Sequence, residues 1–144
     1  MNQSNHHIAR LEHDKFIVAK RDDGIYHVYL KDRTVLDLAL QKEMLDFYRQ
    51  ITNNIDGLFI FEAGHMCNVT KQARENAILI EDEVPVCASV VYVQNLVYKM
   101  IANFFNRFNK PKQPYLVVTN FDEGIKWLKS LKPHQINRGG VLAK

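Results

Sequence analysis

Short apolar runs that alternate with amphipathic segments limit the folds open to this chain more than any other feature of its sequence. Residues 58–61 are four consecutive apolar side chains, and residues 86–93 are rich in β-branched residues. Runs of this length and composition are typical of strands that are buried on both faces of a sheet. Because strands joined through helices must run parallel, the alternation predicts an α/β domain with a largely parallel sheet.

An antiparallel β-hairpin is predicted ahead of this alternation. Residues 15–20 and 25–30 are rich in aliphatic and aromatic side chains, and residues 21–24 between them read Arg-Asp-Asp-Gly. An Asp-Gly pair suits the positive φ angles of a tight hairpin turn. We therefore expect the first two strands to be antiparallel and the later strands to be parallel.

Four segments have the 3.6-residue periodicity of amphipathic helices, and each follows a residue whose side chain can cap a helix. They begin after Asp37, Thr70, Asn95 and Asn120 and end near residues 53, 80, 108 and 131. A last short strand is expected at 115–119. The predicted order is ββαβαβαβα, which gives a mixed five-stranded sheet with about four helices over it. The order of the strands within the sheet is left open.

The length of the chain favours a single domain. A chain of 144 residues can bury one core, which we place at about residues 15–132, with loose tails at 1–14 and 133–144. No apolar run reaches the roughly 20 residues of a membrane span, and the polar start is unlike a signal peptide. The 2 cysteines are too few for a disulfide framework. These features predict a cytoplasmic globular protein.

Basic residues are concentrated in the last third of the chain. From residue 99 onward there are 9 Lys and Arg against 2 Asp and Glu. Such asymmetry can mark a nucleic-acid surface, but these charges also have the spacing expected for the outer faces of two helices and a loop. The aromatic residues among them have the spacing of helical core positions rather than of an exposed stacking platform. We therefore expect no specific nucleic-acid binding.

Motifs of known enzyme classes are missing from the sequence. The chain has no phosphate-binding loop, dinucleotide fingerprint, nucleophile elbow or His-Glu-x-x-His pair. His65 and Cys67 could form a nucleophilic pair, but nothing marks an orienting residue or an oxyanion hole. The histidines near the N-terminus and the acidic residues 81–83 lack the ligand spacing of a zinc or calcium site. We expect a protein without catalytic activity, cofactor or native metal.

Four stretches of the chain are more characteristic of one protein family than the overall pattern of strands and helices is. They are the Asp-Gly hairpin, the helix start at 69–74, the core segment 101–105 with 109–111, and the closing segment 123–128. Together with the predicted element order, they resemble the anti-sigma-factor antagonist family, the STAS domains with the SpoIIAA-like fold, and more closely a small stand-alone bacterial branch. The resemblance covers about residues 16–131. It implies a non-enzymatic regulatory module whose partner is a kinase, an anti-sigma factor or another signalling protein, and it leaves open a homodimer.

The resemblance also implies a regulatory site at the start of the second predicted helix. In typical members a serine or threonine there is phosphorylated by a partner kinase. Thr70 is the nearest match, with Asn68, His65 and Cys67 in the same candidate partner-binding loop. A phosphate at a helix start meets free N–H groups and positive potential. The loop lacks the Asp-Ser or Asp-Thr motif of the family, however, and a purely structural helix cap would also place Thr70 here.

A second hypothesis is a binding protein for small apolar, lipid-like ligands. Phe104, Phe105 and Phe108 recur at helical spacing and could line a ligand cavity, although such a stripe usually belongs to a core. A lipid-binding fold family, CRAL-TRIO, is similar in its arrangement of sheet and helices and holds an apolar ligand beneath helices. The chain is shorter than most binders of this kind.

Overall fold

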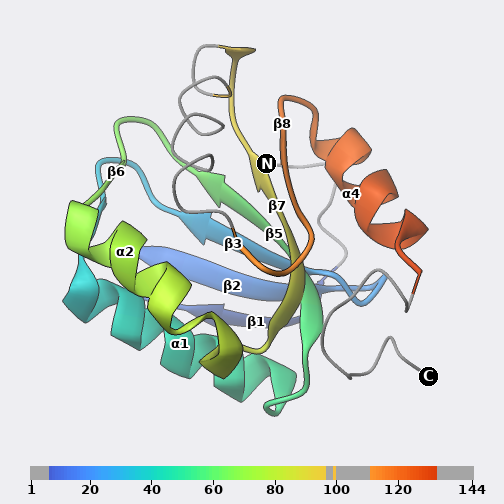
Figure 1. Cartoon of the computed structure of the whole chain (residues 1–144), viewed down its shortest axis with the longest axis horizontal. Helices are drawn as coiled ribbons and strands as arrows, with labels where there is room; N and C mark the ends of the chain where they lie inside the picture. The colour runs from blue at the N-terminus through green and yellow to red at the C-terminus, as the bar shows by residue number, and fades with distance from the viewer. Residues whose placement is uncertain (1–6, 97–98, 100–110, 133–144) are drawn as a thin grey trace.

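The computed structural model describes residues 7–96, 99 and 111–132, and strands and helices alternate along them after an initial run of strands (Figure 1). In chain order the elements are β1 (His7–Glu12), β2 (Phe16–Arg21), β3 (Tyr26–Leu30), β4 (Val35–Leu36), α1 (Leu38–Thr52), β5 (Gly57–Ala63), β6 (Asn68–Val69), α2 (Lys71–Leu79), the 3₁₀ helix η1 (Glu81–Glu83), β7 (Val86–Tyr92), β8 (Tyr115–Val118) and α4 (Phe121–Ser130). The predicted α/β class is confirmed.

The main sheet has the strand order β1-β2-β3-β5-β7-β8. β1, β2 and β3 pair antiparallel, and each later pair is parallel. The predicted hairpin is present: Gly24 has a φ of 87°, and its N–H donates to the carbonyl oxygen of Arg21 at 3.0 Å. The division into an antiparallel start and a parallel remainder is therefore as predicted.

The number of strands differs from the prediction. The described residues form a six-stranded sheet rather than a five-stranded one, because β1 lies in a stretch that we expected to be part of a tail. β1 is an edge strand whose side chains are mostly exposed, so its pairing with β2 leaves little apolar pattern in the sequence. A second, two-stranded sheet of β4 and β6 was also not predicted. The helix predicted after Asn95 falls mostly outside the described residues.

The three described α-helices begin at the predicted caps. The carboxylate of Asp37 accepts a hydrogen bond from the N–H of Leu40 at 2.9 Å at the start of α1. Asn120 accepts one from the N–H of Glu123 at 3.0 Å at the start of α4. Each of these bonds satisfies an N–H that has no partner within its own helix. The side chain of the residue before the helix therefore sets where the helix begins.

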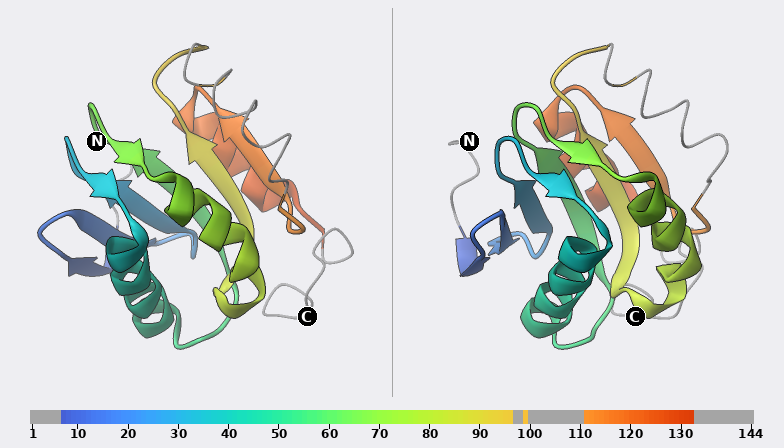
Figure 2. Two further views of the ribbon diagram at one scale, coloured as in Figure 1. Left: turned by 60° about the vertical axis from the view of Figure 1, so that its left-hand side comes forward. Right: turned by 90° about the vertical axis from the view of Figure 1, so that its left-hand side faces the viewer.

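The helices lie on both faces of the main sheet. α1 and α2 are on one face and α4 is on the other (Figure 2). On the α1 face, a cluster of buried side chains includes Phe16, Val28 and Phe59. On the α4 face, a second cluster joins Ile60 and Val90 to Leu128. Because successive strand residues point to opposite faces, the central strands contribute to both clusters.

Candidate functional site

The predicted partner-binding loop, which carries His65, Cys67, Asn68 and Thr70, lies where two parallel strands end. β3 and β5 are parallel neighbours, and the chain leaves them into residues 31–36 and 64–70. The carboxyl ends of parallel strands meet at one edge of a sheet, which is where open α/β proteins commonly bind ligands. We call residues 31–36 and 64–70 together the double-loop surface.

Hydrogen bonds join the two loops of this surface. The N–H of Arg33 donates to the carbonyl oxygen of His65 at 2.8 Å, and the N–H of His65 donates to Oδ1 of Asp32 at 2.8 Å. The next residues of the loops pair as β4 and β6, which form a short parallel ladder. The two loops are therefore one structural unit, although they are distant in the sequence.

Backbone conformation adds a further constraint on these loops. A Cβ atom on Gly64 would collide with the carboxylate of Asp32, so glycine allows the close approach of the two loops. Met66 and Arg33 have φ angles of 60° and 62°, in the left-handed region that residues other than glycine rarely adopt. Such angles persist where the surrounding contacts hold them. The double-loop surface is therefore held in a specific conformation.

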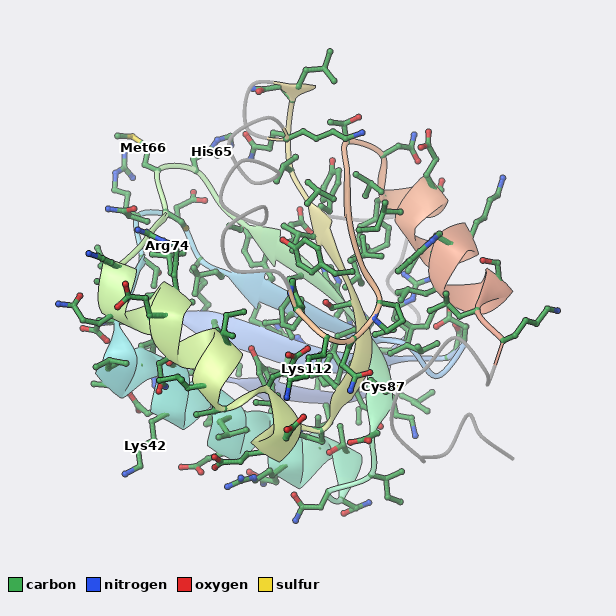
Figure 3. All side chains as sticks on the ribbon, in the orientation of Figure 1. Lys42, His65, Met66, Arg74, Cys87 and Lys112 are labelled. Carbon is green, nitrogen blue, oxygen red and sulfur yellow. The ribbon has the colours of Figure 1, made fainter. Side chains whose placement is uncertain are left out.

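Apolar side chains are exposed on and beside the double-loop surface. Met66 is 77% exposed, Val35 is 50% exposed, and Leu38, at the first position of α1, is 46% exposed. Val35 pairs with Asn68, which places it near the loop that carries Met66. Met66 and His65 lie at the tip of that loop, at the upper edge of the molecule (Figure 3). Met66, Val35 and Leu38 were not predicted as site residues, because their exposure depends on how the two loops pair.

Thr70 occupies the predicted position at the start of α2. Its Oγ1 accepts a hydrogen bond from the N–H of Ala73 at 3.1 Å, and the side chain is half-buried. The hydroxyl oxygen therefore caps the helix, a contact worth about 1 kcal/mol. The same position faces the free N–H groups of the first helical turn, which are the groups that a phosphate would bind.

The other predicted site residues do not converge on one point. The thiol of Cys67 is half-buried and donates to the carbonyl oxygen of Lys31 at 3.0 Å, whereas His65 is exposed. Oδ1 of Asn68 accepts a hydrogen bond from the N–H of Val69 at 2.9 Å. Within the described part of the chain, no hydrogen bond links the Cys67 thiol to the His65 ring. The arrangement therefore offers no nucleophile paired with a base.

The carboxylate of Asp32 links the two loops of the double-loop surface. The hydroxyl of Tyr29 lies 3.5 Å from the same Asp32 oxygen that accepts from the backbone of His65. Burial, followed by the charges of Asp32 and Glu62, raises the pKa of Tyr29. Tyr29 is therefore neutral near pH 7, and the Asp32 carboxylate serves mainly to hold the two loops together.

An apolar, partly open cavity lies between α1, α2 and the sheet. Its volume is about 500 Å³, and a smaller cavity of about 280 Å³ shares part of its lining. The described side chains that line the larger cavity include Leu36, Met44, Phe61, Ile78 and Val91. At its edge, Gln41 donates to the carbonyl oxygen of Ala73 at 2.8 Å and accepts from Asn76 at 2.8 Å. The cavity is thus apolar inside, with its polar edge already hydrogen-bonded.

The acidic turn at η1 is also part of the structure rather than an open ion site. The carboxylate of Glu81 accepts hydrogen bonds from the N–H groups of Lys112 and Gln113 at 3.1 and 3.0 Å. The ammonium group of Lys112 lies 3.3 Å from the carboxylate of Asp82. Among residues 7–96, 99 and 111–132, no three His, Cys, Asp or Glu side chains are grouped so that they could hold a metal ion.

Among the helices of the described residues, none has both the length and the apolar character that a membrane crossing requires.

Comparison with known proteins identifies the fold. A solved structure of an uncharacterised protein of the DUF3478 family from Shewanella loihica PV-4, which has a SpoIIAA-like fold, matches with a TM-score of 0.56 at 9% sequence identity. The match covers 82% of this chain and 97% of that chain. A family model described as a domain of unknown function, DUF7793, matches residues 19–132. No curated protein matches the sequence. The SpoIIAA-like fold expected from the resemblance is therefore confirmed.

Proposed function

The chain belongs to the DUF7793 family and has a SpoIIAA-like fold, and from this premise we propose that it is a protein-interaction module that acts without catalytic turnover. The partner that we propose is a cytoplasmic signalling protein such as a kinase or an anti-sigma factor. The observation that carries the proposal is the double-loop surface, in which hydrogen-bonded loops present exposed apolar side chains.

The apolar side chains of this surface favour a protein as the ligand. Met66, Val35 and Leu38 are each about half exposed or more, although they are large and apolar. Clustered exposed apolar residues mark protein interfaces more often than isolated ones do. Binding through loops already held in one conformation costs less conformational entropy than binding through loops that must become ordered. The double-loop surface meets both conditions.

We place a regulatory switch at Thr70, at the edge of the same surface. Its backbone N–H donates to the carbonyl oxygen of Leu36 at 3.0 Å, so Thr70 lies where the two loops meet. A phosphate on the hydroxyl would add negative charge at the start of α2, where the helix dipole stabilises it. Partner binding would then change while the fold stays intact.

Partner capture with matched baits tests the interaction. Wild-type protein, Met66→Asp and Leu79→Asp are used to recover proteins from a lysate of the host. Leu79 is 80% exposed near the end of α2, so its variant adds the same charge outside the double-loop surface. We expect one partner that the wild type and Leu79→Asp recover and that Met66→Asp loses. With that partner purified, Met66→Asp should weaken the affinity by about tenfold or more.

Two results would contradict this proposal. One is a partner that binds Met66→Asp as tightly as it binds the wild type, since that partner would use another surface. The other is reproducible turnover of a small substrate by the pure protein, which would favour an enzyme. For the switch, intact-mass analysis of protein purified from its host should show a phosphate at Thr70. If no growth condition yields this phosphate and Thr70→Asp leaves binding unchanged, the residue is only a cap.

The apolar cavity favours a second candidate function, the binding of a small lipid-like ligand. Its volume of about 500 Å³ falls within the range typical of ligand pockets, and its described lining is largely apolar. Native mass spectrometry with a medium-chain fatty acid tests this function. Ala77 is an exposed residue that lines the cavity, so Ala77→Trp should reduce binding while Leu79→Trp leaves it unchanged. Absence of a bound complex, or equal binding by both variants, would exclude this cavity as the ligand site.

A further inference from the structure

A second group of polar side chains lies on the other face of the sheet, beside α4. His7 in β1 is the cross-strand partner of Arg21 in β2, so both side chains are on the same face. The guanidinium carbon of Arg21 lies 5.5 Å from the centre of the Phe121 ring, and Phe121 begins α4. The ring of His27, from β3, lies 5.1 Å from the same aromatic ring. Three adjacent strands thus bring basic groups to the start of α4.

Arg21 is held in a fixed orientation within this group. Its Nε and Nη2 donate to the carboxylate of Asp23 at 3.1 and 2.9 Å, and its side chain is only 13% exposed. A guanidinium held through two of its nitrogens directs its third nitrogen, Nη1, along one line. This nitrogen is therefore preorganised to donate to a ligand.

Two nitrogens of the group are buried and have no partner. They are Nη1 of Arg21 and Nε2 of His7, and neither has a hydrogen-bond acceptor or donor among the residues that the structure describes. Buried polar atoms are nearly always hydrogen-bonded, and a water or an ion bound at the position is one explanation of an exception. Because the two residues are cross-strand partners, one small ligand could contact both nitrogens.

The charge around these nitrogens favours an anion. Burial, and then the charges of His27, Arg10 and Arg21, lower the pKa of His7, and the opposing charge of Asp22 does not offset them. His27 itself is not available as a donor through Nε2, because that nitrogen lies 2.9 Å from a carboxylate oxygen of Glu62. Positive potential at His7 therefore comes from several strands at once, and it would be reduced by a negatively charged ligand.

We propose that His7 and Arg21 form a binding subsite for a small oxyanion, the phosphate or carboxylate group of a ligand. In this arrangement Nη1 of Arg21 donates to one oxygen, and Nε2 of His7 donates to the same oxygen or to a second one. The subsite is separate from the double-loop surface and from the apolar cavity, and it does not depend on the function proposed for either.

Titration with inorganic phosphate at constant ionic strength, with chloride as the balancing anion, tests the subsite. Resonances of the His7 ring and the Arg21 guanidinium are followed by ¹H–¹⁵N NMR, with acetate as the parallel titrant for a carboxylate. We expect saturable shifts of both residues with a Kd in the millimolar range or tighter for at least one of the two anions. The anion that binds more tightly identifies which chemical group the subsite prefers.

Matched variants separate the subsite from general charge effects. His7→Ala and Arg21→Gln should each weaken anion binding by about tenfold. Lys20→Gln removes one positive charge from the same strand as Arg21. Because Lys20 faces the Tyr26 ring on the other side of the sheet, this variant should bind the anion as tightly as the wild type does. Circular dichroism checks that each variant is folded, and His7→Ala, at the start of an edge strand, serves if Arg21→Gln does not fold. Linear shifts without saturation, or equal weakening in Lys20→Gln and His7→Ala, would overturn the proposal.

Discussion

On one face of the sheet α4 packs directly against the strands, whereas on the other face α2 and the sheet border a partly open cavity. Four residues of α4 are buried, and Gly124 comes so close to β7 that a Cβ atom there would lie 2.8 Å from Cγ1 of Val90. In α2 only Ala73 is buried, and Ile78 lines the cavity instead of filling it. Among the described residues, the part of the sheet beneath α4 is therefore more closely packed than the part beside α2.

This difference has a physical cause in the sequences of the two helices. The apolar residues of α4 recur on one side, so the helix buries a continuous stripe that includes Ile125 and Leu128. The side of α2 that lines the cavity carries two alanines, Ala73 and Ala77, and one large apolar side chain, Ile78. Two hydrogen bonds of the Gln41 side chain, to the backbone of Ala73 and from Asn76, join α2 to α1. Helix α2 thus depends more on caps and polar contacts than on apolar burial. The second candidate function, the binding of a small apolar ligand, would use the cavity beside this helix.

The largest expected effect is the loss of a side chain from the packed face. Leu128 is 1% exposed, so Leu128→Ala should lower the free energy of unfolding by about 3 kcal/mol. Ile78→Ala removes a side chain that already borders a cavity, and its cost should be about 1 kcal/mol or less. Urea denaturation followed by circular dichroism measures both values. Equal costs for the two variants would show that α2 packs as closely as α4 does.

Adding a side chain should show the same difference between α4 and α2. Gly124→Leu places atoms where Val90 and Ile60 already lie, and it should destabilise the protein by about 2 kcal/mol. Ala77→Leu adds the same kind of bulk at the border of the cavity and should change stability by less than about 0.5 kcal/mol. The two midpoints in urea are compared directly. A stable Gly124→Leu protein would mean that α4 can move away from the sheet at little cost.

The element pattern could be predicted from the sequence because its signals are local. Caps such as Asp37 and Asn120 act on N–H groups within the next turn, and the Asp-Gly turn acts within four residues. β1 escaped prediction because an edge strand is stabilised by its neighbour rather than by a buried apolar pattern of its own. The strand order was also left open, since it depends on pairing between distant segments.

The candidate site could be predicted only in part. Thr70 was identified because it is both a cap and the position at which the resemblance places a phosphorylated residue. The hydrogen bond between His65 and Asp32 joins residues 33 positions apart, and no local pattern indicates such a contact. The pairing of β4 with β6, and with it the exposure of Val35, follows from the same long-range contacts. The double-loop surface could therefore be identified only from the structure.

The cap of α2 should contribute a smaller amount of stability than the packing of α4. Thr70→Ala removes the acceptor for the N–H of Ala73 and should lower the free energy of unfolding by about 1 kcal/mol. Thr70→Asp retains an acceptor and adds a negative charge at the helix start, so it should be nearly neutral. Thermal or urea unfolding distinguishes the two. An equal loss in both variants would mean that the hydroxyl has a role in the fold beyond capping.

The smallest expected effect is a pH dependence at the hairpin turn that contacts α4. Burial of Asp23 favours the protonated form and by itself would raise the pKa. Two effects outweigh it: hydrogen bonds from Arg21 and from the N–H of Ile25, and the positive charges of Arg21 and of Lys129 in α4. The pKa of Asp23 therefore lies below its ordinary value of 3.8. A carboxyl whose pKa is lowered in the folded state stabilises the protein above its unfolded pKa. That stability is lost as the pH falls from about 3.8 through the lowered pKa of the folded state.

Asp23→Asn removes this contribution and tests its sign. At neutral pH the variant should be about 0.5 kcal/mol less stable than the wild type, because the pair with Lys129 is partly exposed and only the contact to Arg21 is well shielded. Below the lowered pKa of Asp23 the two proteins should converge in stability, since the wild-type carboxyl is then protonated as well. Urea unfolding of both proteins across the acidic range measures the difference. A gap that stays constant with pH would show that the charge of Asp23 does not stabilise the hairpin turn against α4.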